Sequence, residues 1–214
     1  MKLRRFAPFA IALLSVSRLI AQDGWKPLLE GSSTAGWTNA AGAAAHSGWV
    51  ARDGALSADK GAGDIWSKER YGDFVLELEF KTTGNSGIFI RTGDRKNNVQ
   101  TGIEIQVENP GGPDKHSVGA LYDLVPPTKC NAKKDDWNKV RITAQGPKIT
   151  VEINGEKVNE MNVDQWTTPG QNPDGSKNKY AKAVKDFPRE GFIGFQDHGH
   201  AVSYRNVRIK PLTH

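Results

Sequence analysis

Cysteine is almost missing from this chain of 214 residues, since Cys130 is the only one. A lone cysteine cannot close an internal disulfide, so the fold cannot rest on a disulfide framework. Because no cysteine stands near the amino-terminal apolar segment, we also expect no lipid anchor there. We interpret Cys130 as a small, partly buried side chain rather than as a reactive thiol.

Long apolar runs are missing too. The apolar stretch 6–16 is shorter than the roughly twenty residues that a membrane-spanning helix needs, and Arg18 follows closely. It comes after a short basic segment and before Ala21, a small residue suited to cleavage. This order is typical of a secretory signal peptide. We therefore expect residues 1–21 to be a signal peptide and residues 22–214 to form one domain that is periplasmic or secreted.

The chain has no long run of lysine and arginine. It carries 29 basic and 24 acidic residues, and four of the basic ones lie in the expected leader. Removing the leader leaves 25 against 24, a net charge of about +1. Proteins that bind nucleic acid usually present a basic surface. The charge balance therefore argues against a nucleic-acid partner.

Amphipathic helix patterns and repeats of 20 to 50 residues are also lacking, and period-two patterns take their place. Apolar and polar residues alternate over 74–80, 103–107 and 140–144. Such alternation is typical of strands with one buried face. Asn154-Gly155 predicts a tight turn inside a hairpin over 149–158. These patterns predict an all-β sandwich around a single core.

Polar side chains on three of the predicted strands face away from that core. Glu104 and Gln106 alternate with core residues on one strand, Arg91 ends another, and Gln196 and His198 share a face on a third. Alternate positions on a strand point the same way, so these groups are expected to line one groove for a polar ligand. Each has an ordinary explanation as a solvated residue, an ion-pair partner or a turn residue. Their combination favours a functional site.

Aromatic residues and one long loop add to this picture. The six tryptophans are many for one domain, and tryptophan faces often stack on sugar rings. We consider Trp66 and Tyr122 as stacking residues and Asn85 as a hydroxyl ligand. Residues 164–188 are rich in Pro, Gly, Asn and Lys and are expected to form a long loop, which is uncommon unless it is functional or disordered.

Short segments along the whole chain form a further pattern. In order, they include Gly24-Trp25-Lys26-Pro27-Leu28-Leu29, Tyr71-Gly72-Asp73-Phe74, Gly84-Asn85-Ser86-Gly87, Glu104-Ile105-Gln106, Gly119-Ala120-Leu121-Tyr122 and Gly194-Phe195-Gln196-Asp197-His198-Gly199. Together they resemble the 3-keto-disaccharide hydrolase domain family. The resemblance implies a concanavalin A-like jelly-roll β-sandwich of two antiparallel sheets, export in bacteria, and action on glycosides oxidised at C3.

The chemistry follows from the carboxylates. Ordinary glycosidases use two, and the Glu104 strand offers one. A 3-keto sugar needs only one base, because the ketone acidifies the C2 proton; the C1 oxygen then leaves by β-elimination and water adds to the enone. We predict His198 and Glu104 as base and acid, in an order left open, and Arg91 as the stabiliser of the enolate. The residues expected to bind substrate are Asn85, Gln106, Gln196, Asp197, Trp66 and Tyr122, with Asp197 also supporting its own turn.

Several alternatives stay open. No spaced metal motif occurs, so no cofactor is expected to be required; a divalent cation on Glu104 and His198 in place of Arg91 is the alternative. The expected partner is a glycoside or oligosaccharide. The rival functions are a non-catalytic carbohydrate-binding module, an ordinary glucanase and a purely structural exported domain.

Overall fold

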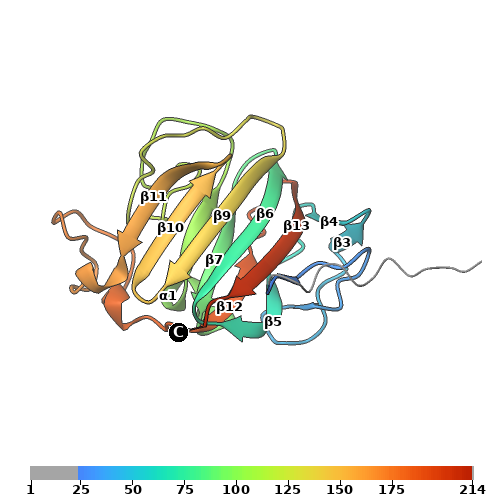
Figure 1. The fold of residues 1–214 in the computed structure, drawn as a ribbon, viewed down its shortest axis with the longest axis horizontal. Coiled ribbons are helices and arrows are strands. Elements are labelled where there is room, and N and C mark those ends of the chain that lie inside the picture. Colours follow the sequence, from blue (N-terminus) through green and yellow to red (C-terminus); the bar gives the residue numbers. More distant parts are fainter. Residues whose placement is uncertain (1–23, 214) are drawn as a thin grey trace, which may run out of the picture.

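Figure 1 shows the protein in a computed structural model, which describes residues 24–213. Two antiparallel sheets of eight and five strands pack face to face. This confirms the predicted β-sandwich of two antiparallel sheets. The expected signal peptide lies outside the described residues. Within 24–213, no helix is both long and apolar enough to cross a bilayer.

The eight-stranded sheet is the front layer in Figure 1. In spatial order it consists of β11 (Glu156–Asn162), β10 (Lys148–Ile153), β9 (Asn138–Gln145), β6 (Phe74–Thr82), β13 (Val202–Pro211), β4 (Ala55–Ala58) and β3 (Trp49–Arg52), with β1 (Lys26–Pro27) paired to β13. The predicted hairpin is present as β10 and β11. They are joined at Asn154-Gly155, where both residues have positive φ, as the tight turn requires.

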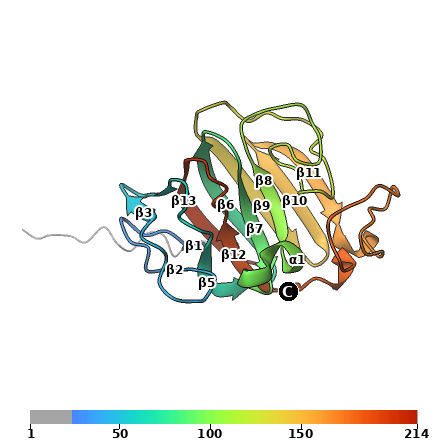
Figure 2. The same cartoon turned by 180° about the vertical axis from the view of Figure 1, so that it is seen from behind.

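The five-stranded sheet is seen from behind in Figure 2. In spatial order it consists of β2 (Trp37–Thr38), β5 (Ile65–Tyr71), β12 (Gly191–Phe195), β7 (Ser86–Thr92) and β8 (Ile103–Val107). The described helices are short: η1 (Arg95–Asn97), α1 (Asn98–Thr101), η2 (Val163–Gln165) and η3 (Val184–Asp186). The last two lie at the ends of the expected loop 164–188, whose remaining residues are mainly irregular.

The core lies between the two sheets and follows the period-two pattern. On β6, Phe74, Leu76, Leu78 and Phe80 are at most 2% exposed, and Glu77 and Glu79 point outward. From the other sheet, Ile88 and Ile105 are fully buried opposite them. Burying one such side chain stabilises a fold by about 1.5–3 kcal/mol, so this shared interior holds the sheets together.

The edge strand β8 is covered by an irregular segment. Gly119 N–H donates to the carbonyl of Gln106, and Tyr122 N–H donates to the carbonyl of Glu104. This pairing satisfies backbone groups that an open edge would expose. It also brings Tyr122 beside Glu104. Consequently every residue of β8 is buried, including those that face away from the core.

Candidate active site

The outer face of the five-stranded sheet carries the predicted polar residues. Glu104 lies opposite Phe89 on β7, and Gln106 lies opposite Gly87. Glu104 and Gln106 are only 4% and 1% exposed. They point away from the core, as the alternation predicts, but loops cover them, so the site is sheltered from solvent.

Two glycines on this face make room for larger neighbours. A Cβ on Gly87 would stand 2.4 Å from Glu104 Oε1, and a Cβ on Gly194 would stand 2.4 Å from the Trp66 ring. Real Cβ atoms essentially never come that close to a non-bonded atom, so the space beside each glycine is already taken: the carboxylate of Glu104 lies across Gly87, and the indole of Trp66 lies across Gly194. The side chain of Glu104 therefore lies flat on the outer surface of the sheet and extends from β8 towards β7.

Glu104 is paired with a cation from the long loop. Lys179 Nζ lies 3.6 Å from Glu104 Oε2 and 3.8 Å from the centroid of the Tyr122 ring. Burial raises the pKa of the Glu104 carboxyl, and the positive charge of Lys179 opposes this rise. Burial lowers the pKa of the Lys179 ammonium, and Glu104 opposes that change. Both groups are thus shifted towards their neutral forms, as is typical of acid–base sites.

A second carboxylate, Asp64, lies directly before β5 and within electrostatic reach of Glu104. Its two oxygens accept hydrogen bonds from Asp197 N–H at 3.0 Å and from Asn98 Nδ2 at 3.0 Å. Burial raises the pKa of Asp64, and its charge also raises the pKa of Glu104. The charge of His198 lowers the pKa of both carboxyls. Glu104, Asp64 and His198 therefore lie within electrostatic reach of one another.

His198 lies in the loop after β12 rather than on the strand, because β12 ends at Phe195. Its side chain is exposed. Asp197 holds this loop: its carboxylate accepts hydrogen bonds from the N–H groups of Gly63 and Gly199. The expected support of the turn by Asp197 is confirmed. With both of its oxygens bonded to backbone, a substrate role for Asp197 has no support in the structure.

Asn85 and Gln106 form a polar pair beside Glu104. Gln106 Nε2 donates to Asn85 Oδ1 at 3.0 Å and to Glu108 Oε2 at 3.3 Å. The backbone N–H of Asn85 donates to His200 Nδ1, which ties this turn to the loop that carries His198. Gln196 follows β12, and its backbone N–H donates to the carbonyl of Gly87. The structure thus brings Asn85, Gln106 and Gln196 to one side of the sheet.

Arg91 corrects the sequence analysis. Between β12 and β7 the register runs from Phe192–Thr92 to Gly194–Phe89, so β7 has one extra residue, and Arg91 has a φ of 50°. This bulge breaks the period-two alternation. The guanidinium donates instead to the carbonyls of Gly72 and Gly146 and to Asp73 Oδ1, each at 2.7–2.8 Å. Arg91 therefore connects the turn at Gly72-Asp73 to the turn at Gly146, and it is not the cation beside Glu104.

The two proposed stacking residues are also corrected. Trp66 is fully buried, with its ring against Phe89 and Gly194, so it offers no face to a sugar. Tyr122 is half-buried; the ammonium of Lys179 lies over its ring, and His116 packs 4.8 Å away. Trp66 instead serves as the floor of the site, and Tyr122 as the wall that positions Lys179.

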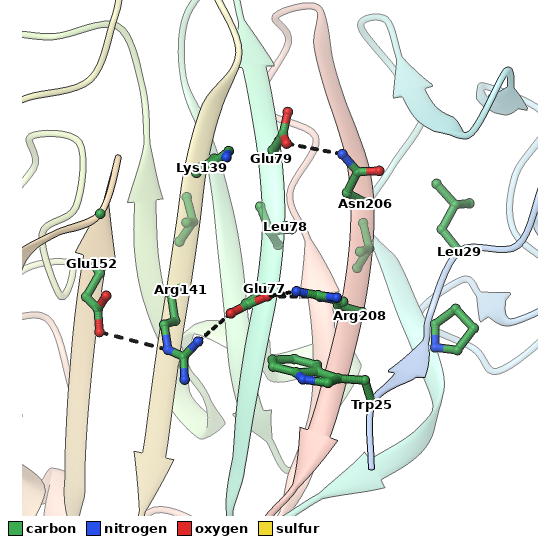
Figure 3. A pocket seen from close by; sticks show the side chains of 14 residues that line it. Trp25, Leu29, Glu77, Leu78, Glu79, Lys139, Arg141, Glu152, Asn206 and Arg208 are labelled. Carbon is green, nitrogen blue, oxygen red and sulfur yellow. Dashed lines mark hydrogen bonds and ion pairs between the residues drawn. The ribbon is translucent and has the colours of Figure 1, made fainter. Parts of the chain in front are cut away.

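A groove of about 620 Å³ lies on the other side of the molecule, on the outer face of the eight-stranded sheet (Figure 3). None of the predicted site residues lines it. Most of its charges are paired across strands: Glu77 with Arg141 and Arg208, and Glu79 with Arg205, while Asn206 also donates to Glu79. Because most ionic groups of this surface already bond one another, we place the site on the opposite sheet.

Comparisons with known proteins show the family to which this chain belongs. Residues 24–210 match the family described as the 3-keto-alpha-glucoside-1,2-lyase-like domain. The chain belongs to this family. A 3-keto-disaccharide hydrolase of Bacteroides thetaiotaomicron is 30% identical, over 89% of this chain and 79% of that protein. The crystal structure of a candidate glycosyl hydrolase from Parabacteroides distasonis is 33% identical, with a TM-score of 0.76, over 88% of this chain and 99% of that one. A second such structure from that organism is 23% identical with a TM-score of 0.73.

In this member of the lyase-like family, Asp64, Asn98 and Lys179 lie at the site but were not predicted from the sequence. Asp64 precedes a strand and Asn98 lies in a short helix, so no periodic pattern marks either of them. For Lys179, the only indication in the sequence was the length and composition of loop 164–188, which suggest a functional loop. Over residues 24–213, no group of three or more His, Cys, Asp or Glu is placed to hold a metal ion. Cys130 is half-buried and free, and burial raises the pKa of its thiol, as expected for an unreactive side chain.

Proposed function

We propose that this protein is an exported enzyme that cleaves 3-keto-glycosides by β-elimination followed by hydration. The observation that carries the proposal is the buried Glu104 carboxylate, which lies across Gly87 beside the ammonium of Lys179. A base and a cation at one sheltered position are what abstraction of a proton beside a ketone requires. Membership of the lyase-like family and the name of the Bacteroides relative support the same chemistry.

Each step has a group that can serve it. Glu104 or His198 removes the proton from C2 of the 3-keto sugar, and the electrons of that bond move towards the C3 oxygen. Lys179 takes the role first given to Arg91 and stabilises the enolate oxygen. The enolate then expels the C1 oxygen, to which the other acid–base group delivers a proton. Water adds to C1 of the enone and a proton returns to C2, so the net reaction is hydrolysis.

Deuterium labelling tests this route. In D₂O, a product formed by elimination and hydration gains deuterium at C2 in every turnover, whereas direct hydrolysis leaves only the slow solvent exchange of this acidified proton, which is measured on the 3-keto product without enzyme. We expect cleavage of a 3-keto-β-glucoside with C2 labelling and no comparable cleavage of the unoxidised glucoside. Equal or faster cleavage of the unoxidised glucoside would end the elimination proposal.

Three variants assign the groups. Glu104→Gln, His198→Ala and Lys179→Met should each lower kcat/KM by at least about 10²-fold, the usual range for acid–base and electrostatic groups. Lys182→Met is the matched control, since Lys182 is an exposed lysine of the same loop. If all three site variants fold normally and keep near-normal activity, the site is misplaced.

A second function is favoured by one observation, the presence of Asp64 near Glu104. An ordinary glycosidase uses two neighbouring carboxyls, one as acid with a raised pKa and the other as an ionised carboxylate; here burial raises the pKa of both. The labelling experiment separates the two enzymes, because a two-carboxylate glycosidase cleaves the unoxidised glycoside without C2 labelling. A carbohydrate-binding module would bind either sugar and cleave neither.

A further inference from the structure

Two amide oxygens on the outer face of the five-stranded sheet have no hydrogen-bond partner. They are Gln106 Oε1 and Gln196 Oε1, and both are buried. Leaving a buried acceptor unpaired costs roughly 1–3 kcal/mol, so such atoms in folded proteins usually point to a missing partner. Two in one place call for a shared explanation.

The two glutamines flank Gly87 in one row: Gln106 lies on β8, Gly87 on β7, and Gln196 directly after β12. Gln106 is the register partner of Gly87 on β8, and the backbone N–H of Gln196 donates to the carbonyl of Gly87 from the other side. Neighbouring strands lie about 4.8 Å apart, so the two backbones are separated by about 10 Å. Since Gly87 has no side chain, the space between the two glutamines is left to the carboxylate of Glu104.

The orientation of the Gln106 amide follows from its neighbours. Its nitrogen faces the carboxylate of Glu108, which can only accept, and also faces Asn85 Oδ1. Turning the amide would place oxygen against a carboxylate, so the unpartnered atom is the oxygen. Gln106 is therefore held as an acceptor towards the site.

We propose that Gln106 Oε1 and Gln196 Oε1 form a binding subsite for sugar hydroxyl groups at Gly87. Together with the Glu104 carboxylate they present three acceptors, which suits a ligand with several O–H donors on one ring. The same acceptors repel a carboxylate, sulfate or phosphate, and the nearby ammonium of Lys179 is already paired with Glu104, so the subsite selects neutral sugars over uronic acids. This inference rests on the proposed function for the identity of the ligand as a glycoside.

Binding of methyl β-glucoside, measured by calorimetry or NMR, tests the subsite without turnover. Gln106→Leu and Gln196→Leu should each weaken its binding at least about 10-fold. Thr92→Val is the matched control, because Thr92 Oγ1 is another buried unpartnered atom on the far end of β7, and its loss should leave binding unchanged. A second measurement needs no variant: mono-deoxy and mono-O-methyl glucosides should bind the unmodified protein at least about 10-fold more weakly at two ring positions, and methyl glucuronide should bind worse still.

The outcomes are distinct. Equal binding by both leucine variants, or no deoxy position that matters, would mean that ordered water satisfies the two oxygens and would overturn the subsite. If the deoxy and leucine effects appear while a 3-keto-glucoside is not cleaved, the proposed reaction fails and the subsite stands. If cleavage is observed but the amide dependence is not, the reaction stands and the subsite fails.

Discussion

The carboxylate of Glu104 lies across the backbone of Gly87, with 2.4 Å between Glu104 Oε1 and the point where a Cβ at position 87 would stand. Glu104 Cγ and Cδ lie 3.0 and 3.1 Å from the same point. The backbone at Gly87 is ordinary extended strand without positive φ, so the glycine is needed for space and not for its conformation. The missing side chain on β7 thus sets where the carboxylate of β8 can point.

Gly87→Ala should lower kcat/KM by about 10²-fold, because a shift of about 1 Å in a reacting group has an effect of that size. The end of a glutamate side chain can move aside, so the melting temperature should fall only slightly. Steady-state kinetics and thermal unfolding check both parts. Gly111→Ala is the control, since nothing lies within 4 Å of its Cβ position. Unchanged activity in Gly87→Ala would show that the carboxylate need not lie there.

Gly194→Ala, in contrast to Gly87→Ala, should clearly lower the stability of the protein. A Cβ there would meet two atoms of the Trp66 ring at 2.4 Å, and the fully buried indole packs against Phe89 and has little room to move. Overpacking of this kind costs about 1–3 kcal/mol, which chemical denaturation can measure. A variant as stable as the parent would mean that Trp66 is not the rigid floor described above.

Most of the fold could be predicted from the alternation of residues, and the exceptions have local causes. In strands without a bulge, such as β6 and β8, successive side chains alternate strictly between the two faces of the sheet. The faces on which Leu76 and Glu104 lie can therefore be predicted from their positions in the sequence. The alternation fails at Arg91, because the bulge in β7 adds one residue and turns the guanidinium to a different direction. No residue in the sequence of β7 indicates that the strand contains a bulge. The same alternation extends β12 too far, to His198, although the strand ends at Phe195.

The site could be predicted only where it rests on strands. Glu104 and Gln106 were found because their faces follow from strand periodicity. Lys179 comes from a loop, and its approach to Glu104 depends on how loop 164–188 folds back over the sheet. Asp64 shares no periodic pattern with Glu104. The second carboxylate, Asp64, and the cation, Lys179, therefore become apparent only in the three-dimensional structure.

Arg91→Met should destabilise the protein by about 3–5 kcal/mol, the usual cost of removing one member of a buried ion pair. Arg91 and Asp73 side chains are 2% and 9% exposed, and Arg91 also bonds two backbone carbonyls. The turnover number of the fraction that stays folded should be unchanged, because Arg91 is engaged elsewhere. A selective loss of kcat without loss of stability would restore Arg91 to the catalytic group.

Glu77→Gln removes an exposed ion pair on the eight-stranded sheet, in contrast to the buried pair of Arg91, and should have a small effect on stability. Glu77 pairs with both Arg141 and Arg208 (Figure 3), yet those side chains are 42% and 50% exposed. Exposed pairs contribute about 0–1 kcal/mol because solvent and salt screen them. We expect a loss of stability below about 1 kcal/mol, smaller still in 1 M salt, with kcat/KM unchanged. A large loss of activity would instead make the groove on that face part of the function.

The raised pKa of Glu104 predicts a pH-dependent stability difference. A carboxyl whose pKa is raised in the folded state favours folding at low pH, and that contribution is lost as the pH rises through the folded-state pKa. Glu104→Gln removes the ionisation, so its melting temperature relative to the parent should rise as the pH increases from about 4 to 8. Each 1 kcal/mol corresponds to roughly 2–4 °C in a domain of this size. Glu104→Gln/Lys179→Met should show the same trend, which excludes an effect of the lysine left without its partner. A difference that is flat with pH, or that reverses, would mean that Lys179 compensates fully for the burial of the carboxylate.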